Sequence, residues 1–218
     1  MSILDALRTE DQSVGKIVGV VAGIVSNNQD PDGLARVKIK FPWLSDDNET
    51  DWVRIATLMA GAERGSFFLP EVGDEVLVAF EHGDINHPYV IGCLWNGVDA
   101  PPETNSDGKN NIRKIRSRSG HEIIFNDDDT TRQEKIEIHT NAGHKIVLDD
   151  AAGQEKIEII DKTGSNKMTI DSVQNAINIE SALQLKIKAQ IVEIEAGGMM
   201  TIKAGATLTI QGALVKIN

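Results

Sequence analysis

From Ile177 to Lys216 the sequence reads in steps of eight residues: INIESALQ (177–184), LKIKAQIV (185–192), EIEAGGMM (193–200), TIKAGATL (201–208) and TIQGALVK (209–216). Apolar residues recur at every second position within most of these steps, which is the period of a β-strand and not of a helix. The segment therefore predicts a series of short strands separated by bends.

Such a segment cannot bury its own apolar side chains. Eight residues hold one strand and a bend, which is too few for a full coil of a single-chain solenoid. Three identical chains winding about one axis would enclose the apolar rows and pair the open strand edges. We therefore predict a homotrimeric needle, a triple-stranded intertwined β-helix, whose core residues are Ile179, Leu185, Ile187, Ile194, Ile202 and Ile210.

The apolar positions change from odd to even numbers along this segment, because Ile194 follows Ile187 after seven residues. A one-residue shift in a strand sends side chains to the opposite face. We therefore expect a bulge or twist nearby, and Gly197-Gly198 would allow it.

Longer repeats precede the eight-residue steps. GHEIIFND (120–127) returns as GHKIVLDD (143–150), and KIEIHT (135–140) returns as KIEIID (156–161). These are internal repeats of strand and turn. His121 and His144 occupy equivalent positions and could form a metal ring across three chains, but their setting after a glycine favours solvated turns. The aspartate runs 127–129 and 149–150 lack the spacing of a calcium loop and favour solvated corners.

The distribution of aromatic residues divides the chain in two. Eight of the nine Trp, Phe and Tyr residues lie at or before Trp95, and only Phe125 follows. Aromatic rings suit a deep globular core, whereas Ile, Leu, Val and Ala suit a thin one. Together with the turn-rich stretch after Gly97, this predicts four parts: an N-terminal docking segment (1–14), a barrel (15–97), a linker (98–112) and the needle (113–218).

Five short strands are expected in the first part. The run from Ala35 to Phe41 alternates apolar and basic residues, and similar runs lie around Ile17–Val25, Val53–Ile55, Val76–Phe80 and Tyr89–Leu94. Five short strands suit a closed barrel of the oligonucleotide/oligosaccharide-binding (OB) type, so the fold class is all-β. Cys93 is expected to be a buried, inert thiol. His82 and His87 flank a segment that could chelate a cation, but a hairpin turn is favoured.

Composition excludes several functions. The net charge of -11 repels phosphate and disfavours nucleic acid as a partner. No apolar run is long enough to span a membrane, and the N-terminus lacks the features of a signal peptide, so assembly in the bacterial cytoplasm is expected. The common hydrolase, metalloprotease, P-loop and dinucleotide motifs are missing, and we predict a protein that is not an enzyme and has no cofactor, catalytic residues or metal site.

An ordered set of motifs between residues 15 and 150 resembles a known family. The motifs are DPDGLARV (30–37), FPW (41–43), WVR (52–54), PEVGDEV (70–76), HPYVIG (87–92), LWNG (94–97), PP (101–102) and RSGHE (118–122). They resemble the central spikes of contractile injection machines, a family comprising phage baseplate assembly V proteins, the valine-glycine repeat (VgrG) spikes of type VI secretion and the spikes of related particles.

This resemblance implies a trimer with an OB barrel at its base and a β-helix needle reaching the C-terminus. Because only about 14 residues precede the barrel, the hub is expected to be a separate protein, contacted through Ile3, Leu4 and Leu7. The iron-binding His-x-His tip of some relatives is not present. A separate cone protein of the Pro-Ala-Ala-Arg repeat (PAAR) type is expected to dock at Leu214, Ile217 and Asn218.

The function that follows is a mechanical one. The trimer would sit at the baseplate centre of a phage tail or a tail-like particle, transmit the force of sheath contraction and pierce a target cell envelope. The particle is expected to be delivered to the target envelope or released from the producing cell. Two rivals stay open: a trimeric tail-spike depolymerase that degrades polysaccharide, and an OB-type module that binds nucleic acid.

Overall fold

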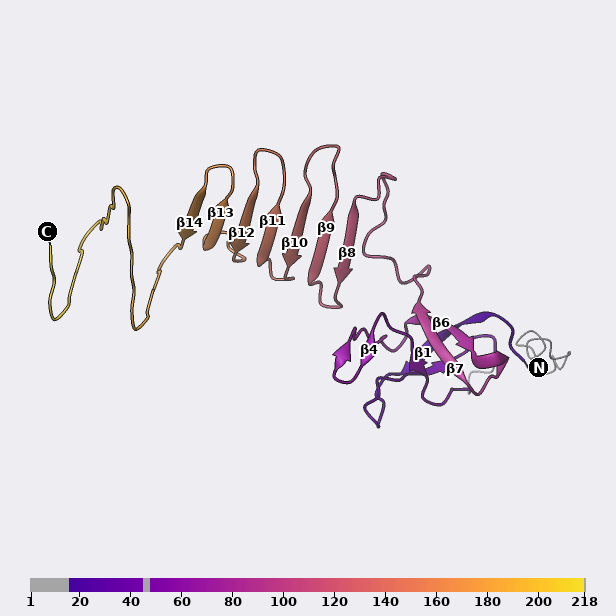
Figure 1. The fold of residues 1–218 in the computed structure, drawn as a ribbon. Coiled ribbons are helices and arrows are strands. Elements are labelled where there is room, and N and C mark those ends of the chain that lie inside the picture. Colours follow the sequence, from indigo (N-terminus) through magenta and orange to yellow (C-terminus); the bar gives the residue numbers. More distant parts are fainter. Residues whose placement is uncertain (1–15, 45–47, 218) are drawn as a thin grey trace, which may run out of the picture. The chain divides into compact units, whose positions relative to one another are not determined.

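The computed structural model describes residues 16–44 and 48–217, which fall into two compact units, Met1–Gly108 and Lys109–Asn218 (Figure 1). The described residues contain β-strands and one short 3-10 helix, η1 (Glu81–Gly83), and none of them lies in an α-helix. The all-β class predicted from the sequence is confirmed.

The first unit contains a five-stranded sheet in the order β2-β1-β6-β7-β3. Its strands are β1 (Val20–Asn27), β2 (Lys38–Lys40), β3 (Arg54–Ile55), β6 (Glu75–Phe80) and β7 (Pro88–Cys93). Two backbone hydrogen bonds of 2.8 and 3.0 Å join Val37, beside β2, to Val53, beside β3. They connect the two outer strands, so the sheet closes on itself as a barrel.

The barrel core consists of inward-facing residues at alternate strand positions. Gly23 on β1 lies against this core, where a Cβ atom would come within 2.5 Å of the Ile39 side chain, so only glycine fits. Nine residues form the buried cluster: Val25, Val37, Ile39, Phe41, Val53, Val76, Val78, Phe80 and Val90. A small hairpin, β4 (Ala60–Gly61) and β5 (Arg64–Gly65), extends the unit.

The structure corrects the prediction for Cys93, which is exposed. The register of β6 and β7 shifts between Val90 and Gly92, so strict alternation does not hold there, and Cys93 pairs with the buried Val76. Cys93 is the last residue of β7, and its exposure at the strand end could not be read from the apolar run around it.

A tight turn precedes β2 and depends on one carboxylate. Asp30 accepts backbone hydrogen bonds from Asp32, Leu34 and Arg36, at 3.1 to 3.3 Å, and its side chain is only 2% exposed. The Arg36 guanidinium donates two more hydrogen bonds, of 2.7 and 2.8 Å, to the same carboxylate. These bonds, led by those from the Arg36 side chain, hold the pKa of Asp30 well below its usual range.

We predict that Asp30→Asn lowers the melting temperature of the barrel at pH 7, because the amide is uncharged and accepts fewer hydrogen bonds. A depressed pKa means that ionised Asp30 stabilises the fold above the unfolded-state pKa of about 3.9, and that this contribution is lost as the pH falls through the folded-state value. The difference in melting temperature between the unchanged protein and Asp30→Asn should therefore be constant above pH 5 and shrink below pH 4. Thermal melts across this range provide the measurement, and equal melting at pH 7 would contradict it.

The second unit begins with a seven-stranded antiparallel sheet whose strands follow one another in chain order. They are β8 (Ile112–Arg116), β9 (Glu122–Asn126), β10 (Lys135–His139), β11 (Lys145–Asp149), β12 (Lys156–Ile160), β13 (Lys167–Asp171) and β14 (Ala176–Glu180). The sequence repeats at 120–127 and 143–150 each contain one of these strands. From Ile112 to Glu180, therefore, every strand pairs with a neighbour in its own chain.

Past Glu180 the described chain contains no strand up to Ile217, and it changes direction at bends that recur every seven to eight residues. The bends lie at 182–183, 190, 197–198, 205–206 and 213. We call the extended pieces between them legs. The bends at 190 and 213 take one residue and the others take two. The seven-residue step from Ile187 to Ile194 is thus made at the short bend at Gln190, and the expectation that Gly197-Gly198 makes it is wrong.

Candidate functional site

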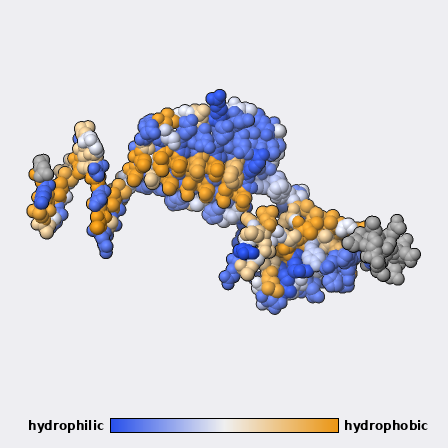
Figure 2. Space-filling model, in the orientation of Figure 1, coloured by the Kyte–Doolittle hydropathy of each residue, from blue (hydrophilic) through white to orange (hydrophobic). Residues whose placement is uncertain are grey.

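One face of the seven-stranded sheet is apolar and uncovered. The second and fourth residues of each strand from β9 to β14 form apolar pairs, which we call doublets, and they lie on the same face. All but Met168 and Ile170, which are half-buried, are exposed, by 38% to 65%. Figure 2 shows the resulting hydrophobic band along the sheet. The doublets are Ile123/Phe125, Ile136/Ile138, Ile146/Leu148, Ile157/Ile159, Met168/Ile170 and Ile177/Ile179.

Strand register aligns the doublets into two continuous rows. Ile138 pairs with Ile123 on one side and Ile146 on the other, and the same row continues through Ile159 and Met168 to Ile179. The second row runs from Phe125 to Ile177 in the same way. A monomeric protein rarely exposes an apolar patch of this extent, so the face is a candidate interface.

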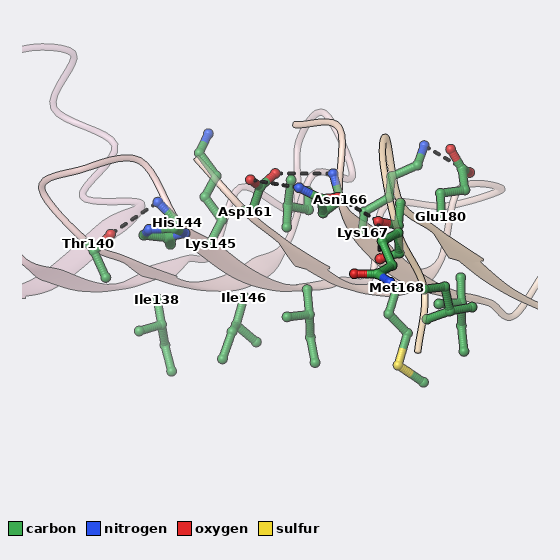
Figure 3. Close-up of a pocket in the computed structure, with 16 residues that line it drawn as sticks. Ile138, Thr140, His144, Lys145, Ile146, Asp161, Asn166, Lys167, Met168 and Glu180 are labelled. Atoms are coloured by element: carbon green, nitrogen blue, oxygen red, sulfur yellow. Dashed lines mark hydrogen bonds and ion pairs between the residues drawn. The ribbon is translucent and has the colours of Figure 1, made fainter. Parts of the chain in front are cut away.

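A hollow of about 560 Å³ lies on this face between β10 and the first leg. Figure 3 shows Ile138, Ile146 and Met168 projecting from one side of the sheet into it, while polar turn residues such as His144 and Asn166 lie at its edge. Ile179 and Leu185, two of the predicted core residues, line the same hollow. It has the character of an unfilled protein core and not of a polar catalytic cleft.

The opposite face of the sheet is mostly polar and rich in ion pairs, and its two apolar residues in β9 and β11, Ile124 and Val147, are buried. Lys114 pairs with Glu122 at 3.7 Å, Lys156 with Glu158 at 3.2 Å, and Lys167 with Glu180 at 3.3 Å, each measured from Nζ to a carboxylate oxygen. Such a face suits contact with water. The sheet therefore has one polar face and one apolar face. We call the polar face the wet face and the apolar face, which carries the doublets, the dry face.

The doublets continue through the legs, where they are Leu185/Ile187, Val192/Ile194, Met200/Ile202, Leu208/Ile210 and Val215/Ile217. Their spacing of eight, seven, eight, eight and seven residues from Ile179 to Ile217 matches the order of the bends, which take two, one, two, two and one residues. Within the described chain, residues 185–217 form no hydrogen bond. Extended strands without partners are not stable in water, so the legs are a candidate site for pairing with strands of another molecule.

The six predicted needle-core residues are all doublet members, and each is exposed by 56% to 74% in the single chain. Ile217 is a doublet member too, whereas Leu214 lies before one. Ile3, Leu4, Leu7 and Asn218 lie outside the described residues. Sequence reasoning missed the role of the sheet face from Ile123 to Ile170, although its period of two was visible in the repeats.

The turns on one edge of the sheet are linked by a series of side-chain acceptors. Nδ1 of His121 accepts the backbone N–H of Asn141 at 3.2 Å, and Nδ1 of His144 accepts that of Lys162 at 3.1 Å. One turn further on, the side-chain oxygen of Asn166 accepts the N–H of Ala182 at 3.2 Å. The two histidines therefore join successive hairpins, a role that the expectation of solvated turns did not include.

We predict that His144→Ala destabilises the second unit by about 0.5–1 kcal/mol per chain, because the N–H of Lys162 loses its acceptor. His144→Asn is the matched control, since asparagine performs this role at position 166, and it should retain most of the stability. Chemical unfolding of both variants would measure the difference. Equal loss in the two would show that the ring, and not the hydrogen bond, matters.

The described residues contain no group of three or more His, Cys, Asp or Glu side chains placed to hold a metal ion. His87 instead contacts Asp84 in the turn after η1, with 3.0 Å between Nδ1 and the carboxylate. No helix in the described part of the chain is long and apolar enough to cross a bilayer.

Comparison with known proteins identifies the barrel. Residues 21–95 match the family model described as the type VI secretion system/phage-baseplate injector OB domain. The barrel is therefore similar to the injector OB domains, and the resemblance to the injection-machine spikes is confirmed.

Three curated relatives extend the match. The chain is 30% identical over 133 residues to the type VI secretion system spike protein VgrG3 of Vibrio cholerae, covering 57% of this chain and 13% of the relative. It is 34% identical over 131 residues to spike protein VgrG5 of Pseudomonas aeruginosa, covering 51% and 17%. It is 31% identical over 133 residues to a V. cholerae protein named actin cross-linking toxin VgrG1, covering 57% and 12%. The match thus spans less than a fifth of each relative.

Proposed function

We propose that this protein is the central spike of a contractile, phage-tail-like injection apparatus and acts as a homotrimeric needle. The similarity to VgrG spikes supports the class of machine. The observation that supports a needle is the dry face, which extends from β9 through the legs and is not covered by other described residues of its own chain.

Three copies would complete this face. Three sheets, each with its doublets turned to a common axis, enclose a prism whose outside is the ion-paired face. Beyond Glu180 each leg gains strand partners from the other two copies, so the needle changes from three separate walls to an intertwined β-helix. Burial of the doublets removes a large apolar area from water and supplies the driving force.

The proposed action is mechanical and involves no catalysis. A continuous ladder of backbone hydrogen bonds distributes an axial load over many strand pairs, so no single contact carries the thrust of sheath contraction. The needle passes that thrust from a separate hub, contacted near Ile3, Leu4 and Leu7, to a PAAR-like tip protein or effector at Leu214, Ile217 and Asn218. The trimer then enters the target envelope.

We predict a mass of three times the 23.7 kDa chain by light scattering on a sizing column. Ile202→Asp should abolish or severely destabilise this trimer, because three carboxylates near the axis cost on the order of 5 kcal/mol in desolvation. Thr201→Asp changes the preceding residue, on the outer face of the same leg, and should leave the mass unchanged.

Two results would overturn the proposal. A well-folded monomer would remove the needle, and an Ile202→Asp protein that stays trimeric with unchanged melting would reverse the inward assignment of the doublets. Release of sugars from a capsular polysaccharide would favour the depolymerase rival. Salt-dependent binding of single-stranded DNA would favour the nucleic-acid rival.

A further inference from the structure

Charged residues follow the doublets in a regular order at the start of the needle. Glu180, Lys188, Glu195 and Lys203 each come directly after the second apolar residue of a doublet, namely Ile179, Ile187, Ile194 and Ile202. The four residues therefore occupy one equivalent position in β14 and the next three legs, on the wet side. Their charges alternate in sign.

The first contact of this series is present within the chain. Lys167 and Glu180 are paired residues in the register of β13 and β14, and Lys167 Nζ lies 3.3 Å from a carboxylate oxygen of Glu180. Adjacent strands of this needle thus place opposite charges side by side. With Lys167 included, the series alternates over five successive strands or legs.

The later members have no partner in their own chain. Lys188, Glu195 and Lys203 are exposed, and none forms an ion pair with another described residue. These three residues occupy one repeated position, and each is opposite in charge to the next. Unlike Glu180, they have no neighbouring strand in the described part of their own chain.

Symmetry supplies that neighbour, and this step rests on the trimer proposed above. In a threefold needle the equivalent legs of the three copies lie at one height and run in one direction around the axis. The next leg of each copy then stacks on the preceding leg of another copy, with equivalent positions aligned. Lys188 of one copy therefore meets Glu195 of a second, and that Glu195 meets Lys203 of the third.

We propose that Glu180, Lys188, Glu195 and Lys203 form an ion-pair ladder between copies of this chain, which fixes the register of the intertwined needle. If one copy slips along the axis by a single leg, each of its legs lies beside the same leg of another copy, or beside the leg two further along the chain. In either case the two aligned charges have the same sign. Like charges directly opposite on paired strands are destabilising, so the ladder disfavours the slipped assembly.

A second position supports the same arrangement. Lys186 and Glu193 lie between the two apolar residues of successive doublets, and they too have opposite signs. The equivalent residues of the next two legs are Thr201 and Thr209, and beyond Lys203 the ladder position is taken by Gln211. Apart from Lys216, at the equivalent position of the last leg, charge is thus concentrated at the first legs after the chains begin to intertwine, where register is set.

The test compares three full-length variants with the unchanged protein. Glu195→Lys turns six opposite-charge contacts per trimer into like-charge contacts and should lower the melting temperature by about 5 °C or more. Asp150→Lys makes the same charge change at an exposed turn and should have little effect. The combined variant Lys188→Glu, Glu195→Lys and Lys203→Glu restores six opposite-charge contacts between the legs but places a carboxylate at position 188 against Glu180, so it leaves three like-charge contacts in place of six and should recover about half of the loss. In 1 M NaCl the differences should shrink, because exposed charges are screened.

Co-expression establishes whether the contacts join different copies. In a chain with Glu195→Lys, the ladder residues of all three legs are basic. In a chain with Lys188→Glu and Lys203→Glu, they are all acidic. Expressed together with tags of different mass, they should form mixed trimers in excess of the statistical proportions measured by native mass spectrometry. The unchanged chain, co-expressed with the same two tags, provides the statistical reference.

The outcomes separate this proposal from the trimer itself. A monomeric unchanged protein defeats the proposed function. A trimer whose melting is the same in Glu195→Lys and Asp150→Lys, or chains that mix statistically, defeats the ladder and leaves the needle standing. Loss in Glu195→Lys without recovery in the combined variant would also overturn it.

Discussion

The constraint on which this structure depends is the apolar doublet at the second and fourth positions of each strand. Repeated from β9 to Ile217, it gives the chain a dry face that the chain itself never covers. The rest follows from that face: the polar residues are confined to the other side, the loops are restricted to the sheet edges, and assembly becomes necessary for burial. The barrel is different, because it closes on a core of its own.

The two units also differ in how much of them the sequence predicts. Barrel strands such as β6 are visible because alternate residues face one buried core, and the motifs around Asp30 identify the injector OB family. The β4–β5 hairpin was missed, since Ala60–Gly61 and Arg64–Gly65 show no alternation. In the needle, the eight-residue steps indicate the positions of the bends. They do not show that β8 to β14 pair within one chain, because a period of two is the same whichever chain supplies the neighbour.

Candidate interface residues were predictable to the extent that they depend on local pattern. Ile187, Ile194 and Ile202 were found from their spacing, but Val192 and Val215 were not chosen, because each adjoins another large apolar residue and the sequence cannot tell which of the two points inward. The role of His144 was hidden for a different reason. Its acceptor function depends on the next hairpin, and a turn considered alone gives no sign of it.

The change of pairing at Glu180 has a consequence for how the protein is made. The sheet before it can form as soon as one chain is synthesised, since its contacts are local and its hairpins close quickly. In the proposed trimer the legs after it have no such route, because their neighbours belong to other chains. Assembly of that trimer would therefore be slower than folding of the sheet, and its rate would rise with protein concentration. The barrel and the sheet of each chain would already be folded when the legs of the three chains pair.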